Sequence, residues 1–406
     1  MTRVVVLGGA GGIGTVAART VAASGDFDDI VVADVRAEAA AAAAAALGHP
    51  GARGVAVDAT SPDSLAEVLA GADVAVSCIG PFYRFGVPVL TAAIEAGVPF
   101  IDVCDDLDAT ERQLELDGKA EAAGVCAVVG LGNSPGLANL LVRFAADELL
   151  DTCRSVDIMH IHGGEPEEGP AVIQHRIHAM VNDVPVFVDG RFEQVRLLEE
   201  SGRRFVEETD FRDVGTYPVF PYPHPETITL PRHIPGLTWA TNRGVVFPLS
   251  YFEHTMDVVR RGLAAAGDVP RDQLPVEAWT EEILAARARL LAEAGVAGPK
   301  GCLKIVVGGD KDGATHRYVF SISSDTEGAG AGTGIPAGIG ASLVARGLLA
   351  EPGVHPPEAV VRPLEALAIA GEVVPALGIG GAGGGVPVHL VHVLPDGTEE
   401  EIDLGF

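Results

Sequence analysis

The chain has 406 residues, with 56 Asp and Glu against 28 Lys and Arg, which gives a formal net charge of −28. This length predicts two or three domains with a sizeable core. The acidic balance disfavours nucleic-acid and membrane partners, because such a surface repels phosphate backbones and anionic lipid. We expect a cytoplasmic protein with reduced cysteines, since its five cysteines lack CxxC spacing and no signal peptide or spanning helix is evident.

The first 130 residues alternate strand-like and helix-like segments. The strand-like runs are almost wholly apolar, which is typical of strands covered on both faces. They span residues 3–8, 29–35, 53–59, 72–80, 98–104 and 125–132. Helix signals lie at 13–25, 37–47, 61–70, 86–96 and 107–123. This alternation predicts an α/β domain with a doubly wound parallel sheet of the Rossmann type.

The pattern changes after about residue 134 and predicts an α+β domain. Residues 184–195 and 302–323 read as hairpins, and 388–404 as a closing hairpin. Helices are expected at 171–181, 249–267, 281–295 and 334–349, an ordered loop at 216–248, and a flexible glycine-rich loop at 378–385.

We therefore expect four parts. They are a dinucleotide-binding domain at 1–134, an α+β substrate-binding and dimerisation domain at 135–330, a helix and loop at 331–372 that return to the first domain, and a glycine-rich loop with a hairpin at 373–406.

A glycine motif, Gly9-x-Gly11-x-x-Gly14, follows the first strand and precedes a helix. In this setting Gly9 permits the tight turn, Gly11 lets the backbone approach a pyrophosphate, and Gly14 allows close packing of helix and strand. Asp34 ends the second strand, where a ribose diol needs an acceptor. The pairing indicates dinucleotide binding.

The cofactor is expected to be NAD, because the Asp34 carboxylate would repel a 2′-phosphate. Arg36 could offset that repulsion and admit NADP. Asp58 either reaches the adenine side or caps the next helix. The complete set of expected cofactor-binding residues is Gly9, Gly11, Gly12, Ile13, Gly14, Asp34, Arg36, Asp58, Ala59, Cys78, Ile79, Gly80, Pro81 and Cys104.

Six segments together resemble the saccharopine dehydrogenase family: "GGAGGIG", "VADVR", "VDAT", "CIGPFYRFG", "FIDVCDD" and "GLGNSPGLANLL". The resemblance is to the branch with saccharopine reductase, lysine 6-dehydrogenase and carboxynorspermidine dehydrogenase, and it covers residues 1–145 most firmly. It implies a Rossmann domain, a second domain with substrate contacts and dimerisation, and a role in amino acid metabolism. It also implies hydride transfer between a nicotinamide and an amine or imine carbon.

The chain departs from this family in two segments that are expected to face the substrate. Residues 160–181 are unusually rich in histidine, and 242–254 stand where the family has an Arg-Tyr-Pro-Gly turn. An amino acid or polyamine-like amine is therefore the leading substrate class. A ketone, hydroxy or enoyl substrate is the second. Redox-neutral use of NAD, or dinucleotide sensing, is the third.

Amine oxidation needs a proton acceptor, for which histidine is suited near neutral pH. His178 and His224 are the two candidates. Tyr83 could donate to the substrate or to the nicotinamide amide, or serve packing alone. The expected substrate-binding residues are Phe82, Asp105, Asn133, His175 and Arg243.

Several of these residues also have plainer interpretations. Asp105 and Asp106 could bind an ammonium group of the substrate or only cap a helix. Arg243 could hold a substrate carboxylate or form a surface salt bridge. His160 and His162, with the pair on the next helix, could suggest zinc, but we expect no metal.

Overall fold

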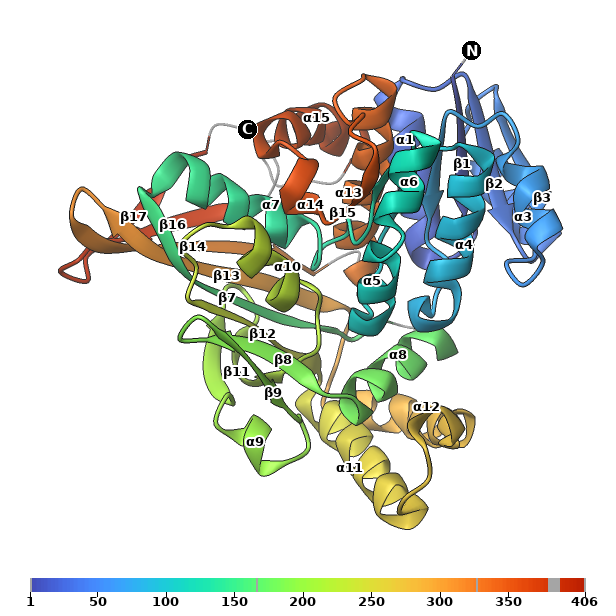
Figure 1. Cartoon of the computed structure of the whole chain (residues 1–406). Helices are drawn as coiled ribbons and strands as arrows, with labels where there is room; N and C mark the ends of the chain where they lie inside the picture. The colour runs from blue at the N-terminus through green and yellow to red at the C-terminus, as the bar shows by residue number, and fades with distance from the viewer. Residues whose placement is uncertain (1, 166, 326–327, 379–387, 405–406) are drawn as a thin grey trace. The chain divides into compact units, whose positions relative to one another are not determined.

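The computed structural model describes residues 2–165, 167–325, 328–378 and 388–404. These residues form two compact units (Figure 1). The first unit comprises Met1–Phe144, Gly330–Pro387 and Leu404–Phe406, and the second comprises Ala145–Ala329 and Val388–Asp403. The first break therefore falls after Phe144 rather than after residue 134, because helix α7 (Leu137–Phe144) belongs to the first unit.

The first unit is built on a parallel sheet with the strand order β15-β6-β5-β4-β1-β2-β3. The strands are β1 (Arg3–Leu7), β2 (Asp29–Asp34), β3 (Ala52–Ala56), β4 (Val74–Ser77), β5 (Phe100–Asp102), β6 (Cys126–Val128) and β15 (Gly353–His355). Val4 and Val6 of β1 join one apolar core, and Val5 and Leu7 join another. Both faces of the sheet are thus covered, as the apolar runs predict.

Helices accompany these strands as expected for a Rossmann sheet (Figure 1). They are α1 (Gly12–Ser24), α2 (Ala37–Ala46), α3 (Pro62–Leu69), α4 (Phe82–Ala96), α5 (Leu107–Leu114), α6 (Asp117–Ala123), α13 (Gly328–Ala345), α14 (Pro357–Val360) and α15 (Pro363–Ala376). The expected helix at 107–123 is divided into α5 and α6. The edge strand β15, which the sequence interpretation missed, pairs with β6.

Helix α13 packs against α1 through glycines. A Cβ atom on Gly334 would lie 2.7 Å from the carbonyl oxygen of Ile13, and one on Gly338 would lie 2.5 Å from Cγ2 of Thr20. Side chains at these positions would force the two helices apart. The glycine-rich sequence of α13 therefore fixes its close approach to the helix that follows the opening glycine turn.

The second unit contains a mixed sheet with the order β10-β11-β12-β7-β13-β14-β16-β17, and β8 pairs with both β12 and β9. Its strands are β7 (Thr152–Gly163), β8 (Val184–Val188), β9 (Arg191–Val195), β10 (Glu207–Phe211), β11 (Gly215–Pro221), β12 (Trp239–Phe247), β13 (Lys300–Lys311), β14 (Ala314–Ser324), β16 (His389–Val393) and β17 (Glu399–Ile402). The helices are α8 (Pro170–Val181), α9 (Glu200–Arg203), α10 (Glu226–His233), α11 (Leu249–Ala266) and α12 (Val276–Glu293), with short turns at Ala145–Leu149 and Arg271–Gln273.

The expected loop at 216–248 is wrong, because this segment contains β11, α10 and β12. Its prolines lie at element boundaries: Pro221 ends β11, Pro225 caps α10 and Pro248 caps α11. Strand β12 lies between β11 and β7 and pairs with β7 in parallel. The three expected hairpins are confirmed as β8–β9, β13–β14 and β16–β17. Of the glycine-rich stretch 378–385, only Gly378 is among the described residues.

Candidate active site

The opening glycine turn joins β1 to α1. Gly8 has φ +73°, so it supplies the left-handed turn that the sequence interpretation assigned to Gly9. A Cβ on Gly9 would lie 2.7 Å from Cγ1 of Val32, so Gly9 is needed for packing against β2. A Cβ on Gly14 would lie 2.1 Å from the carbonyl oxygen of Gly8. Only glycine fits there, which is the close helix–strand contact expected of the motif.

The N-terminus of α1 fits the pyrophosphate of a dinucleotide. Gly11 caps the helix without a side-chain hydrogen bond, and the first turn carries no acidic residue. A Cβ on Gly12 would meet nothing within 4 Å, so the backbone at Gly12 is open. The first N–H groups of a helix have no intrahelical acceptor and carry partial positive charge. Gly11, Gly12, Ile13 and Gly14 can therefore hold phosphate oxygens.

Asp34 is buried at the end of β2 and holds the glycine turn. Its Oδ2 accepts a hydrogen bond from the Ala10 N–H at 3.3 Å. Its Oδ1 accepts from the N–H and from Nε of Arg36, at 3.1 and 3.3 Å. The Arg36 side chain is 65% exposed, so it can move to another anion. This carboxylate–guanidinium pair lies where the ribose of a bound dinucleotide needs polar partners.

Asp58 does not cap the next helix. Its Oδ1 accepts hydrogen bonds from the N–H and the hydroxyl of Thr60, at 2.8 and 2.6 Å, and these bonds lower the pKa of the Asp58 carboxyl. Ser61 is the cap of α3, because its side chain accepts from the Ser64 N–H. Asp58 and its neighbour Ala59 thus lie in an exposed turn after β3.

The ends of β1 and β4 come together at the point where the strand order reverses. The Cys78 N–H donates to the carbonyl of Leu7 at 2.9 Å, and a Cβ on Gly8 would meet Cys78 O at 2.9 Å and Ile79 Cγ1 at 3.2 Å. Gly80 follows, and Pro81 caps α4. Cofactors bind at this position in doubly wound sheets. Burial, reinforced by Asp102, raises the pKa of the Cys78 thiol to about 12, so the thiol is neutral.

Asp102, which the sequence interpretation did not single out, ties the ends of β5 and β6 together. It is fully buried, and its Oδ1 accepts from the N–H groups of Cys104 and Gly130 at 3.0 and 2.8 Å. Its Oδ2 accepts from Nε2 of Gln113 at 2.6 Å. Burial raises the pKa of Asp102 to about 6 although these hydrogen bonds oppose the shift. Its signal in the sequence is an acidic residue ending an apolar strand.

The remaining candidates of the first unit lie around the starts of α4, α5 and α7. Phe82 is buried, and the Tyr83 N–H donates to Oδ2 of buried Asp106 at 2.8 Å. Cys104 is buried, which raises the pKa of its thiol well above the usual value. Asp105 lies on the loop between β5 and α5. Asn133 lies beside α13, since a Cβ on Gly332 would come within 3.3 Å of its side chain.

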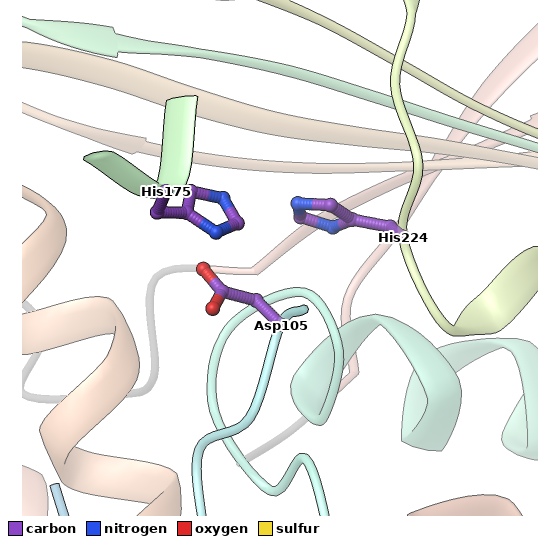
Figure 2. Close-up of side chains that lie close together, drawn as sticks. All are labelled: Asp105, His175 and His224. Atoms are coloured by element: carbon purple, nitrogen blue, oxygen red, sulfur yellow. The ribbon is translucent and has the colours of Figure 1, made fainter. Parts of the chain in front are cut away.

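Four histidines and a tyrosine gather in the second unit. His160 and His162 lie on one face of β7 with ring centroids 6.1 Å apart, as their alternation predicts. His224 stacks on His160 at 5.1 Å, and Tyr222 packs edge-on against both, at 5.5 Å from His160 and 5.4 Å from His224. His175 of α8 lies 6.3 Å from His224, and Figure 2 shows these two imidazoles directed toward each other. Together these five residues are the histidine cluster.

Two buried polar residues orient the histidine cluster. Nε2 of His160 lies 3.2 Å from Oδ1 of Asn242, and Nδ2 of Asn242 donates to Oε1 of Glu226 at 3.4 Å. Oε2 of Glu226 lies 3.6 Å from Nδ1 of His224. Asn242 and Glu226 are fully buried, and His224 is 5% exposed. Glycine at 244 leaves room for the His160 ring, which a Cβ would approach to 2.1 Å.

The histidine cluster holds His160 in its neutral form. Burial lowers the pKa of His160 well below its usual value, and His224 and His162 lower it further. Burial likewise lowers the pKa of His162. A neutral imidazole can accept a proton, which is what an acceptor in amine oxidation requires.

The low pKa of His160 predicts a stability change with pH. As the pH falls through the unfolded value of about 6.5, the unfolded chain binds a proton that folded His160 does not. The free energy of unfolding should therefore decrease below about pH 6.5. In His160→Asn this decrease should be shallower by up to about 1.4 kcal/mol per pH unit between about pH 5 and 6.5. Urea unfolding of both proteins across this range measures the difference, and equal slopes would contradict it.

Two other candidates, His178 and Arg243, are not part of the histidine cluster. The ring contacts with Tyr222 and His224 are made by His175, and His178 lies one turn further along α8, where its carbonyl accepts from Asn182. Arg243 is buried, and it pairs with Glu207 and, at 2.8 Å, with Asp157.

The β-strand alternation separates Arg243 from the histidine cluster. Arg243 pairs in register with Met159, and Gly244 pairs with His160. Successive residues of a strand face opposite sides of the sheet. Arg243 therefore lies on the other face from the histidine cluster.

Several residues of this site were missed by sequence reasoning. Tyr222 and Glu226 could have been found from their positions on either side of His224, in "YPHPE". Arg176 could have been found from its position between two histidines. Asn242 gave no signal, because only the pairing of β12 with β7 brings it to His160.

A family model matches part of the first unit. Residues 4–128 match the model of the saccharopine dehydrogenase NADP-binding domain. Carboxyaminopropylagmatine dehydrogenase of Synechocystis sp. is 24% identical over 375 residues, which covers 87% of this chain and 92% of that protein. Human saccharopine dehydrogenase-like oxidoreductase is 32% identical over 109 residues, 26% of this chain and 25% of that one.

A solved structure extends the likeness to the whole fold. The apo saccharopine dehydrogenase (L-Glu forming) of Saccharomyces cerevisiae has a TM-score of 0.66 at 17% sequence identity, and the match covers 99% of this chain and 100% of that one. The expected fold class, a Rossmann sheet with a second α+β domain, is confirmed.

Proposed function

We propose that this chain, whose residues 4–128 match the model of the saccharopine dehydrogenase NADP-binding domain, is an NAD(P)-dependent dehydrogenase that acts at a carbon–nitrogen centre of an amino acid or a related amine. The observation that carries this proposal is the histidine cluster, in which buried His224 stacks on His160 and lies beside the buried carboxylate of Glu226. Such a cluster suits proton transfer from an amine nitrogen.

The glycine turn would hold the dinucleotide, and the nicotinamide of a bound dinucleotide would supply the hydride acceptor. The protein's own task is to hold the amine and take one proton from its nitrogen. We assign this proton transfer to His224, whose Nδ1 faces Glu226 at 3.6 Å. Glu226 orients the ring and stabilises the imidazolium that forms, and His160, through Asn242, holds the same carboxylate in place.

His178, the other candidate for this proton, stays a prediction, and so do the roles of Tyr83 and the substrate-binding residues. Asp105 belongs to the first unit and lies on the loop after β5.

For the cofactor, we propose NAD as the preferred dinucleotide and NADP as the second. The buried Asp34 carboxylate at the end of β2 favours a ribose diol, and Arg36 offers a guanidinium to a 2′-phosphate.

Asp34→Ser is expected to raise the KM for NAD about 10-fold or more, because charge-assisted hydrogen bonds to the ribose are lost. The KM for NADP should fall relative to that for NAD, since Arg36 loses its internal partner. Arg53→Ser, an exposed change on neighbouring β3, is the control. Unchanged affinity for both dinucleotides in Asp34→Ser would remove Asp34 from the ribose site.

The proposed function is tested by an absorbance screen. The purified protein is mixed with each oxidised dinucleotide and with amino acids, diamines, secondary amines and alcohols. Reduction of the nicotinamide by one amine class is the expected result. Reduction by alcohols alone would favour a hydroxy substrate, whose hydroxyl proton His224, beside Tyr222, would accept.

We further propose a cytoplasmic homodimer. The five free cysteines are consistent with a reducing compartment, and the family resemblance implies dimerisation. Among the described residues, no helix has both the length and the apolar character needed to span a bilayer. Light scattering on the purified protein measures the assembly state, and a monomeric mass would contradict the dimer.

A further inference from the structure

A buried arginine lies beside the histidine cluster. Arg176 of α8 is 1% exposed. Its guanidinium interacts electrostatically with His162 and Tyr222, and it follows His175 directly in sequence. A buried guanidinium keeps its charge, so it needs nearby anions or hydrogen-bond acceptors.

Among the described residues, the carboxylate that pairs with Arg176 is Glu168, and this carboxylate is shared. Nη2 of Arg176 donates to Oε1 of Glu168 at 2.5 Å. Oε2 of Glu168 accepts from the Tyr251 hydroxyl at 2.8 Å and from Nε of Arg287 at 3.2 Å. Two guanidiniums and a phenol thus converge on one carboxylate. This arrangement fixes the position of the Arg176 side chain before any ligand binds.

The other end of the guanidinium is unsatisfied. Among the described residues, Nη1 of Arg176 has no hydrogen-bond partner, although it is buried. An unmade hydrogen bond of a buried charged group is costly. The planar donor geometry of a guanidinium matches the oxygens of a carboxylate or a phosphate. The Nη1 donor is therefore held in place before a ligand binds, on a guanidinium that interacts with His162 and Tyr222 of the histidine cluster.

We propose that Nη1 of Arg176 binds a carboxylate of the substrate, so that the substrate is an amine that also carries a carboxylate rather than a simple diamine. This inference rests on the proposed function for the identity of the reacting group. It transfers the role expected for Arg243 to Arg176, because Arg243 pairs with two carboxylates on the other face of the sheet. Arg176 is then the residue that selects among amines.

Binding of glutarate tests the anion site without turnover. Isothermal titration should show glutarate binding to the wild type, and no binding of its uncharged analogue glutaramide. Arg176→Lys keeps the charge but loses the fixed planar donors, and it should weaken glutarate binding about 10- to 100-fold. Arg261→Lys is the control, because Arg261 is exposed and pairs with Asp257 and Glu282. Circular dichroism checks that each variant is folded.

The outcomes separate this inference from the proposed function. Absence of glutarate binding to the wild type, equal binding of glutaramide, or unchanged binding in Arg176→Lys would overturn the anion site. If Arg176→Lys does not fold, the glutarate and glutaramide comparison on the wild type decides. Turnover provides the second readout: lysine should be preferred over cadaverine by the wild type, and Arg176→Lys should reduce that preference. Glutarate binding without oxidation of any amine would support the anion site at Arg176 and contradict the proposed function.

Discussion

His224→Gln is expected to lower kcat by about 100-fold or more, which is the range for removal of a general base. Glutamine fills similar space and can hydrogen-bond to Glu226, but it cannot accept a proton from the amine. The KM for the dinucleotide should stay unchanged, because the glycine turn and Asp34 lie in the first unit. Steady-state kinetics with the amine found in the screen measure both values.

His233→Gln is the matched control. His233 lies at the end of α10, and its Nδ1 is 2.9 Å from the carbonyl of Thr229, outside the histidine cluster. The kcat of His233→Gln should equal that of the wild type. His178→Gln is the competing variant. If it abolishes turnover while His224→Gln retains it, the proton assignment passes to His178.

Gly14→Ala is expected to destabilise the first unit by about 3 kcal/mol and to weaken dinucleotide binding more than 100-fold. The new methyl would lie 2.1 Å from Gly8 O and 2.8 Å from Gly9 Cα, which are backbone atoms of the cofactor turn. The turn must therefore open, and the N–H groups of α1 lose their alignment. Urea unfolding and fluorescence titration with NADH measure the two effects.

Gly371→Ala distinguishes this local clash from a general effect of replacing glycine. Gly371 lies inside α15, and a Cβ there would meet nothing within 4 Å. Alanine should raise the stability by up to about 1 kcal/mol, because glycine is the poorer helix former. If Gly14→Ala is as stable as the wild type and binds NADH as tightly, the close contact of residue 14 with the glycine turn would be contradicted.

The fold of the first unit could be predicted from the sequence because the patterns that indicate it are local. The apolar runs, the glycines and the acidic residue after β2 each reflect a constraint between near neighbours in the chain. One detail differed: the left-handed residue of the turn is Gly8 rather than Gly9, because two adjacent glycines leave the register of the turn open. The edge strand β15 was missed, since three residues give no periodic pattern.

The second unit could be predicted only in part, because its site depends on contacts between distant segments. His160 and Asn242 meet through the pairing of β7 with β12, and nothing near either residue indicates that partner. The same pairing places Arg243 on the opposite face. Sequence reasoning found histidines of the right type, but only the fold shows that His175 and His224 come together in the histidine cluster.

The central claim is hydride transfer from the carbon of a carbon–nitrogen bond to a nicotinamide dinucleotide. It is tested most directly with the amine identified in the screen, carrying deuterium on the carbon next to nitrogen. Mass spectrometry of the reduced dinucleotide should then find one deuterium on the nicotinamide ring, with the imine or its hydrolysis product formed in equal amount. Reduced dinucleotide without deuterium, or loss of the label to water, would contradict the account.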